Sequence, residues 1–361
     1  MKRRGDVMNT NRKTIMDISR SRQHFLHTIV SIFLALLTLQ LAACGIPQPN
    51  SKQSAPPEPG TYKPVTLQNC GHTLIFTKPP ERVISTYQTT TDILLKLGLE
   101  KHIVGIYFGS VYQPQPEFDA QYKHLNDLGG SMLTVPPKEK VLSLHADFVF
   151  SAYPAGDFLA SYGSVTQEQF NAIGAQIYGM SGECAPDSIH VQATSVYEDI
   201  LNIGRIFSIE ARAQTLVNSM RARVEAIQKR LAHRPLTPVI AMPDFSATQM
   251  QPPFTFIGAG IYTDILRLAG GNNLFAAQNQ TYPSISQEAL AIQKPEVYVL
   301  IHYKDADAAR LTSYLFTTYP NIPASRQHRT ITIEANQWDI GLFMPNTVET
   351  LAHTLHPEVF A

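Results

Sequence analysis

Short runs rich in β-branched and aromatic residues recur along the chain of 361 residues, and helical patterns lie between several of them. The runs cover residues 82–86, 103–108, 147–153, 176–180, 238–244, 297–303 and 329–335. Some of them, such as VYVLIHY, are apolar throughout, which is typical of strands that are covered on both faces. Because strands that alternate with helices form βαβ units, the sequence predicts an α/β fold built on parallel sheets.

The two halves of the chain open alike. In each half a strand run is followed by a loop and then by a similar helical phrase, DILLKLG in the first and DILRLAGG in the second. We expect Thr89–Thr91 and Thr263 to cap these helices, and Gly98 and Gly270 or Gly271 to end them. Both helices begin just after the carboxyl end of a strand, which is where open α/β sheets bind ligands.

A long helical stretch, about Thr194 to His233, separates the two halves. Apolar residues recur in it every three or four positions, as on one buried face of an α-helix. Ser208 can cap a second segment, so we expect a break or kink near it. These patterns divide the folded part of the chain into an N-terminal lobe at 65–193, a connecting helix at 194–233 and a C-terminal lobe at 234–361.

The N-terminus has the pattern of a secretory signal peptide. The chain has 29 basic and 29 acidic residues, of which residues 1–43 hold seven basic and two acidic ones. The remainder therefore has 22 basic and 27 acidic residues and is net acidic. The apolar run at 29–43 would span only about 22 Å as a helix, less than the ~30 Å hydrocarbon core of a bilayer. A basic stretch followed by so short an apolar run predicts a signal peptide at 1–43.

This apolar run ends in the sequence LAAC at residues 41–44, which resembles the lipobox of bacterial lipoproteins. The resemblance implies that Cys44 is lipidated and becomes the new N-terminus. Ordinary secretion without lipidation is the alternative. Residues 44–64 are rich in proline, which predicts a flexible tether between a membrane and a folded body. We therefore expect an extracytoplasmic protein with a lipid anchor in the cell membrane, or a periplasmic one.

Cys70 and Cys184 are the other two cysteines. Outside the cytosol they are candidates for a disulfide, and closing so long a loop would stabilise the fold by about 4–5 kcal/mol in the chain-entropy model. Spacing alone leaves two buried thiols as the alternative.

Five phrases of the chain follow one another in the order expected of one known family. They are PPERVISTYQTTTDILLKLGLEKHIVGI, KVLSLHADFVFSAY, IYTDILRLAGGNNLFA, SISQEALAIQKPEVYVLI and LAHTLHPEVFA. Together they resemble the substrate-binding lipoproteins of ABC importers for iron-siderophores, haem and cobalamin, over roughly residues 70–360. The sequence departs from the family at Ala146, where a proline is usual.

The resemblance implies two Rossmann-like βα lobes joined by one long rigid helix, with a ligand cleft between the lobes. It implies a monomer that captures an iron-siderophore-type metal chelate and delivers it to an ABC permease and its ATPase. Cobalamin and haem are the alternative ligands. No catalytic residue, cofactor or metal site of the protein's own is expected.

A receptor for a large chelate needs aromatic surface and few fixed charges. The loops expected at the cleft supply these candidate ligand-binding residues: Tyr87, Tyr107, Tyr112, Tyr153, Phe245, Phe254, Tyr262, Tyr303 and Trp338. Each could pack in a core instead, so the group is better evidence than any member. These loops hold no clear arginine, only Lys304, which argues against a strongly anionic chelate and leaves neutral hydroxamates, a corrinoid or haem open.

The resemblance also implies a pair of docking residues. In the family one glutamate on each lobe pairs with arginines of the permease, and the matching positions are Glu139 and Glu288. The alternative is that both are solvated glutamates at helix starts, stabilised there by the helix dipole.

Several function classes lack their sequence features. The formal net charge of zero argues against a nucleic-acid-binding protein. The chain has neither a G-x-S-x-G nucleophile motif nor a P-loop, and its twelve histidines are scattered. Two other classes stay open: an extracytoplasmic hydrolase-like enzyme that uses Asp244 or His302, and an adhesion lipoprotein with an exposed apolar patch.

Overall fold

The computed structural model describes residues 62–109, 114–131, 134–184, 187–244, 254–303, 306–338 and 340–360. The predicted signal peptide at 1–43, Cys44 and the tether up to residue 61 lie outside the described residues. The chain divides into two compact units, Met1–Gly60 and Thr61–Ala361, and the second is the one described below. Within the described ranges, none of the helices combines the length and apolar character that crossing a membrane requires.

Four parallel strands form the N-terminal sheet, in the order β4-β3-β5-β6. They are β3 (Val83–Ser85), β4 (Ile103–Ile106), β5 (Phe148–Ser151) and β6 (Gln176–Gly179). Alternate side chains enter two different cores: Val83 and Phe148 pack in the larger one, and Ile84 and Val149 in the smaller one. Both faces of the sheet are therefore covered, as the apolar runs predicted.

The C-terminal sheet is built in the same way, in the order β12-β11-β7-β9, all parallel. Its strands are β7 (Thr237–Pro243), β9 (Gly271–Asn273), β11 (Val297–His302) and β12 (Thr330–Glu334). Val239 and Val299 point into the larger core, whereas Ile240 and Leu300 point into a separate core of this lobe. The seven predicted strand runs are thus confirmed, and β9 was not foreseen.

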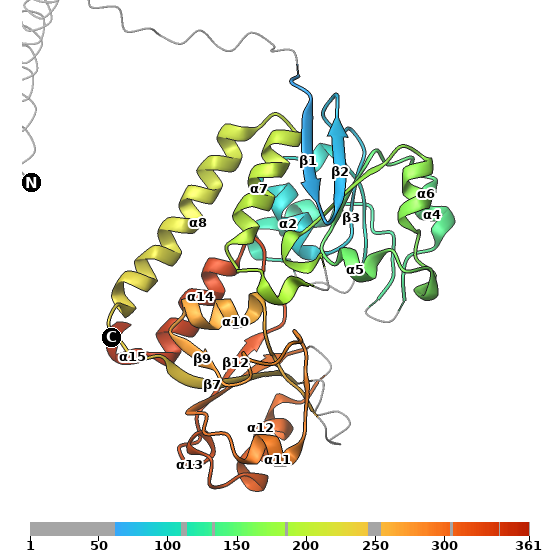
Figure 1. Cartoon of the computed structure of the whole chain (residues 1–361). Coiled ribbons are helices and arrows are strands. Elements are labelled where there is room, and N and C mark those ends of the chain that lie inside the picture. Colours follow the sequence, from blue (N-terminus) through green and yellow to red (C-terminus); the bar gives the residue numbers. More distant parts are fainter. Residues whose placement is uncertain are drawn as a thin grey trace, which may run out of the picture. The chain divides into compact units, whose positions relative to one another are not determined.

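Helices cover these sheets (Figure 1). In the N-terminal lobe they are α2 (Gln88–Lys96), α3 (Asp119–Tyr122), α4 (Lys138–Leu142), α5 (Pro154–Asp157) and α6 (Gln167–Ala172). In the C-terminal lobe they are α10 (Ile261–Leu268), α11 (Gln287–Ala291), α12 (Ala308–Thr318), α13 (Pro323–Arg326), α14 (Met344–Leu355) and α15 (Pro357–Phe360). Short 3₁₀ turns include η2 (Glu100–His102), η3 (Pro116–Phe118), η4 (Ala160–Tyr162), η5 (Ser181–Glu183) and η6 (Asp187–His190).

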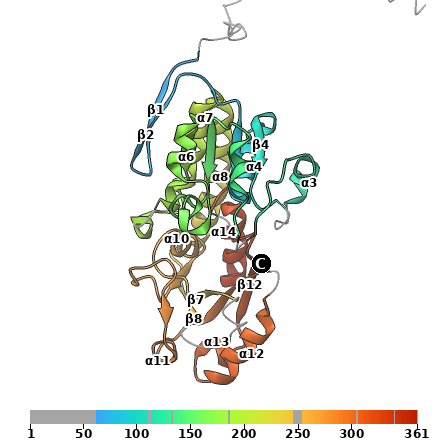
Figure 2. The same ribbon diagram turned by 90° about the vertical axis from the view of Figure 1, so that its right-hand side faces the viewer.

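The predicted connecting helix consists of two helices, α7 (Ser195–Ile206) and α8 (Glu210–Leu231). The expected break is confirmed, but Ser208 does not cap α8: it takes a left-handed backbone conformation with φ of 54°. The chain turns back there, so that α7 and α8 lie side by side (Figures 1 and 2). The long helix between the lobes is therefore α8 alone, whose 22 residues span about 33 Å.

One core joins the two lobes. The larger core contains residues of both sheets, together with buried side chains of α7, α8, α10 and α14. Phe118 of η3 packs edge-to-face on Phe343, which precedes α14, with ring centroids 6.2 Å apart. At the start of α8, Arg212 donates to the Leu97 carbonyl at the end of α2. The lobes are thus held by packed side chains as well as by the linking helix.

Two antiparallel strand pairs complete the fold and were not predicted. β1 (Val65–Asn69) pairs with β2 (His72–Phe76), and β8 (Phe254–Thr255) pairs with β10 (Ser284–Ile285). The first pair turns at Cys70 and Gly71, both with positive φ. Its alternation of buried and exposed residues is that of a strand with one covered face.

Candidate functional site

Two tyrosines stand at the carboxyl ends of strands in the N-terminal lobe. Tyr87 follows β3 and is the N-cap residue of α2, and Tyr153 follows β5 and is the N-cap residue of α5. Their rings meet edge-to-face with centroids 5.0 Å apart. Phe108, which follows β4, lies edge-on to Tyr87 at 6.5 Å. Three neighbouring strands of one sheet therefore deliver three aromatic rings to the same edge.

Buried hydroxyl groups fix Tyr87. Thr90 and Thr91 each donate to the Tyr87 carbonyl over 3.0 Å, and each also bonds to the Ser85 hydroxyl. These threonines do not cap α2 as predicted, because they lie inside its first turn and bond backward. Their effect is to hold the loop that carries Tyr87.

The partly buried carboxyl of Asp157 fixes Tyr153. Asp157 Oδ2 accepts hydrogen bonds from Ser151 Oγ (2.6 Å), Thr86 Oγ1 (2.5 Å) and the Tyr153 backbone N–H (3.3 Å). Burial raises the pKa of Asp157 to about 6, against the lowering effect of these hydrogen bonds.

Tyr262 lies at the centre of the aromatic wall in the C-terminal lobe. It stands in the first turn of α10, and its ring stacks on Trp338 with centroids 5.7 Å and planes 12° apart. Tyr282 lies 5.9 Å from Tyr262, and a side-chain hydrogen bond joins the two residues. Tyr282, which is half exposed, was not predicted from the sequence.

The loop before α10 explains why Tyr282 lies there. The Gly258 N–H donates to the Thr281 carbonyl over 2.8 Å, and a Cβ at position 258 would lie only 2.2 Å from the Gln280 carbonyl oxygen. Only glycine permits so close an approach of the two segments. Thr263 does not cap α10, because its hydroxyl donates back to the Gly258 carbonyl.

Tyrosines of the two lobes face one another. Burial raises the pKa of Tyr153 and of Tyr262 well above the ordinary value. Electrostatic interaction with residues of the other lobe raises each pKa further. For Tyr153 these residues are Tyr282 and Tyr303, and for Tyr262 the residue is Tyr153. These phenols stay neutral at physiological pH. We use the term aromatic cluster for Tyr87, Phe108, Tyr153, Tyr262, Tyr282, Tyr303 and Trp338.

The carboxyl group of Glu183 lies at this cluster. It was not predicted, although it belongs to the segment that follows the carboxyl end of β6. Glu183 ends η5 and interacts electrostatically with Tyr153, Tyr262 and Tyr282. Its Oε1 atom is buried and has no hydrogen-bond partner. Burial raises the pKa of Glu183 to about 7. The next residue, Cys184, forms a disulfide with Cys70, with Cα atoms 5.0 Å apart.

A histidine–aspartate pair stands at the carboxyl ends of β7 and β11. His302 Nδ1 lies 2.5 Å from Asp244 Oδ2, and Asp244 Oδ1 accepts the Tyr303 backbone N–H over 3.0 Å. Asp244 is fully buried. The hydrogen bond to Asp244 raises the pKa of His302. The pair fixes the backbone from which Tyr303 projects.

Comparison with known proteins identifies the family. The family model described as "Periplasmic binding protein" matches residues 83–336, which include both sheets. The chain belongs to the periplasmic binding protein family. Because a periplasmic binding protein holds a solute and does not convert it, the enzyme alternative built on Asp244 and His302 is wrong.

Known relatives of this periplasmic binding protein include a curated sequence and several solved structures. A vitamin B12-binding protein of Yersinia pestis is 25% identical over 225 residues, which are 61% of this chain and 69% of that protein. A periplasmic binding protein of Veillonella parvula has a TM-score of 0.71 at 19% identity, over 82% of this chain and 99% of that one. An ABC-type Fe³⁺-hydroxamate transport system protein of Saccharomonospora viridis has a TM-score of 0.64 at 22% identity, over 82% of this chain and 99% of that one.

Tyr107 and Phe254, which were also predicted to bind the ligand, are buried in cores within single lobes, whereas Tyr262 and Trp338 are buried in the larger core that joins the lobes. The Tyr107 N–H donates to the Ser85 carbonyl, so the chain still follows β4 there and the side chain turns into the smaller core of the N-terminal lobe. Phe254 is buried in the separate core of the C-terminal lobe, against Tyr314. Tyr112 and Phe245 lie outside the described residues.

The predicted docking residues of the binding protein are both at the surface. Glu139 is exposed in the first turn of α4, and Glu288 is exposed in the first turn of α11. Backbone and Ser286 hydrogen bonds lower the pKa of Glu288. Both side chains are therefore accessible to a partner.

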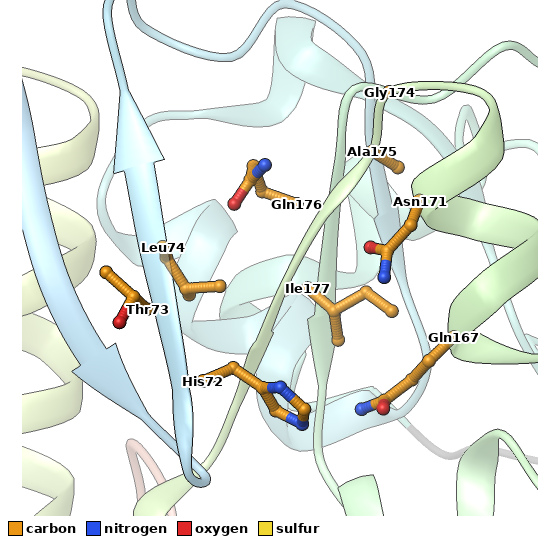
Figure 3. Close-up of a pocket in the computed structure, with 9 residues that line it drawn as sticks. All are labelled: His72, Thr73, Leu74, Gln167, Asn171, Gly174, Ala175, Gln176 and Ile177. Carbon is orange, nitrogen blue, oxygen red and sulfur yellow. The ribbon is translucent and has the colours of Figure 1, made fainter.

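A pocket of about 280 Å³ lies apart from the aromatic cluster, between β2, β6 and α6 (Figure 3). Its lining residues are His72, Thr73, Leu74, Gln167, Asn171, Gly174, Ala175, Gln176 and Ile177. It shares no residue with the aromatic cluster. In the described part of the binding protein, no group of three or more His, Cys, Asp or Glu side chains is placed to hold a metal ion.

Proposed function

We propose that this chain is the extracytoplasmic substrate-binding lipoprotein of an ABC importer, and that it captures a bulky metal chelate of the iron-siderophore type. The aromatic cluster carries the proposal. It brings rings from both lobes to one place, and aromatic faces provide a large contact area at a low entropic cost. A large, partly apolar solute fits such walls.

The charge of the cluster favours a chelate that is not strongly anionic. Its described members are neutral phenols, a phenyl ring and an indole. The Glu183 carboxyl lies beside them, and the His302–Asp244 pair adjoins Tyr303. A neutral ferric hydroxamate meets this condition, and the Saccharomonospora viridis neighbour is a protein of an Fe³⁺-hydroxamate transport system.

Cobalamin is the second candidate ligand. The curated relative from Yersinia pestis is a vitamin B12-binding protein, and 69% of its length aligns with this chain. A corrinoid is also bulky, with apolar faces that suit aromatic walls.

Calorimetric titration of the purified protein with a ferric hydroxamate, a ferric catecholate, haem and cyanocobalamin tests the proposal. Trp338 is the only tryptophan, and it belongs to the aromatic cluster, so its fluorescence supplies a second readout. We expect saturable binding of one neutral chelate with a change in emission. Failure of all four ligands to bind a folded protein would refute the proposal.

Membrane anchoring through Cys44 is a separate part of the proposal. A lipidated Cys44 would tether the binding unit to the membrane that holds the permease and its ATPase. In cells fed a labelled fatty acid, the wild-type protein should take up the label and Cys44→Ala should not. Equal labelling of the two would show that Cys44 is not the anchor.

A further inference from the structure

A buried hydrogen-bond acceptor without a partner adjoins the aromatic cluster. Glu183 Oε1 has no hydrogen bond, and its side chain interacts with Tyr153 of its own lobe and with Tyr262 and Tyr282 of the other. Buried polar atoms in native proteins are nearly always paired, so an exception needs a reason. An acceptor left unpaired within a binding site is a position for a donor that arrives with the ligand.

The turn that carries Glu183 is fixed at both ends. Asp199 accepts from the Ser181 N–H over 3.1 Å and from the Ser181 hydroxyl over 2.5 Å. Three residues later, the disulfide between Cys184 and Cys70 ties the turn to the hairpin of β1 and β2. A carboxyl held in this way is placed before any ligand arrives, which reduces the entropy lost on binding.

The same turn packs directly on the opposite lobe. A Cβ at Gly182 would lie 2.6 Å from Ile261 Cδ1, so glycine allows η5 to lie against the start of α10. Nearby, the Ala193 N–H donates to Asp264 Oδ2 over 2.9 Å. Glu183 is therefore set at the junction of the two lobes, next to Tyr262.

A second unpaired polar atom adjoins the same ring. Trp338 Nε1 is buried without a hydrogen-bond partner, and its indole stacks on Tyr262. Besides the phenol hydroxyls, the aromatic cluster thus offers one unpaired carboxyl acceptor and one unpaired indole donor. An amide group contains the complement of both, an N–H and a carbonyl.

We propose that Glu183 is a specificity-determining residue whose carboxylate accepts a hydrogen bond from an amide N–H on the periphery of the chelate. This inference rests on the proposed function as a chelate receptor. It narrows the ligand class to chelates that carry amide groups, and it gives the disulfide the role of positioning the carboxyl.

The test compares the affinities of three variants for cyanocobalamin and for the ferric complex of a cyclic hydroxamate with amide N–H groups. Glu183→Ala should weaken binding of whichever probe the wild type binds by roughly 10- to 100-fold, as expected for a hydrogen bond to a charged group. Glu183→Gln keeps the shape but not the charge and should lose less. Glu168→Gln, an exposed glutamate in the first turn of α6, is the matched control and should bind as the wild type does.

The pH dependence of the binding affinity is a second test, because it would not change if Glu183 had only a structural role. The pKa of free Glu183 is about 7, and an N–H donor favours the ionised form, so wild-type affinity should rise as the pH rises through 7. The facing phenols of Tyr153, Tyr262 and Tyr282 stay neutral there, and Asp199, with a pKa of about 6, is common to all variants. The rise should be absent in Glu183→Gln.

The outcomes separate the two proposals. If the wild type binds one of the probes and folded Glu183→Ala binds it within twofold, the role of Glu183 is refuted while the receptor function stands. If the wild type binds a chelate without N–H groups as tightly as an amide-bearing one, the amide preference is refuted. If it binds no chelate, both proposals fail.

Discussion

The ring of Tyr262 is stacked on the indole of Trp338, with centroids 5.7 Å and planes 12° apart. The two residues come from different elements, since Tyr262 lies on α10 and Trp338 follows β12. Both side chains are buried, so the packing of the protein itself holds this wall of the aromatic cluster in place. A preformed wall costs less entropy on binding than one that must order.

Replacing Tyr262 should therefore change both the affinity for the chelate and the fluorescence of Trp338. Tyr262→Ala removes the ring that covers Trp338, so we expect a red-shifted tryptophan emission and an affinity for the chelate that is lower by about tenfold, as for a buried aromatic contact. Tyr262→Phe keeps the stacked ring and should keep the emission. Tyr162→Ala, at an exposed tyrosine, is the control. Unchanged affinity in folded Tyr262→Ala would remove this residue from the site.

The disulfide should contribute to both stability and binding. Cys70 and Cys184 are 114 residues apart, and the chain-entropy model gives a bond over so long a loop about 4–5 kcal/mol of stability. We expect Cys184→Ser to lower the free energy of unfolding in urea by a large part of this amount. Since Cys184 adjoins Glu183, chelate affinity should also fall in conditions where the variant is still folded. Equal unfolding curves for the oxidised wild type and the variant would contradict this.

Much of the fold could be predicted because the strands are covered on both faces and so stand out as apolar runs. The helix break at Ser208 was also readable, but the reversal of the chain was not. It depends on the contact between Gly204 and Ala213, where a Cβ on residue 204 would lie 2.4 Å from that of residue 213. Local periodicity describes one helical face and does not say which helix packs on it.

The site could be predicted only in part, for a related reason. Tyr87, Tyr153 and Tyr303 follow strand ends, which is a sequence-readable position. Glu183 also lies in a segment that follows a strand, β6, but a disulfide far from it in sequence positions it, and the close approach at Gly258 positions Tyr282. Tyr107 does not join the aromatic cluster, because the strand continues through it and alternation then turns its side chain into the core.

The close contact of α7 and α8 predicts a steric cost. Gly204→Ala would place its Cβ 2.4 Å from the Ala213 Cβ, so the helices must separate or shift, and we expect a loss of about 1–3 kcal/mol of stability. Gly156→Ala is the matched control, because a Cβ there meets nothing within 4 Å. Urea unfolding measures both variants. A double variant with Ala213→Gly should recover part of the loss, and failure to recover would show that this contact is not the cause.

Asp199 should make the stability depend on pH. Burial raises its pKa to about 6 in the folded protein, against about 3.9 in an unfolded chain, so the folded state binds the proton more tightly. The contribution to stability is fully present below about pH 4 and is lost as the pH rises through 6, by up to about 3 kcal/mol. Unfolding free energies of the wild type and Asp199→Asn, measured from pH 4 to 7, should therefore differ in slope. Parallel curves would contradict the raised pKa.

Docking on the permease is the remaining prediction, and it rests on the exposed positions of Glu139 and Glu288. Each stands in the first turn of a short helix, one on each lobe, where it can meet a basic partner group. Charge complementarity of this kind directs association and fixes the register of two surfaces. We expect Glu139→Arg and Glu288→Arg each to reduce chelate uptake by cells several-fold, and the double variant to reduce it further, with chelate affinity of the purified protein unchanged.

The control for docking is Glu168→Arg. Glu168 is also exposed and also lies in the first turn of a short helix, so the same charge reversal there tests for a general effect of added positive charge. Uptake by cells with Glu168→Arg should match the wild type. Because all these side chains are exposed, none of the substitutions should change the unfolding free energy by more than about 0.5 kcal/mol. If the double variant at 139 and 288 supports normal uptake, these glutamates do not dock the permease, and another surface must do so.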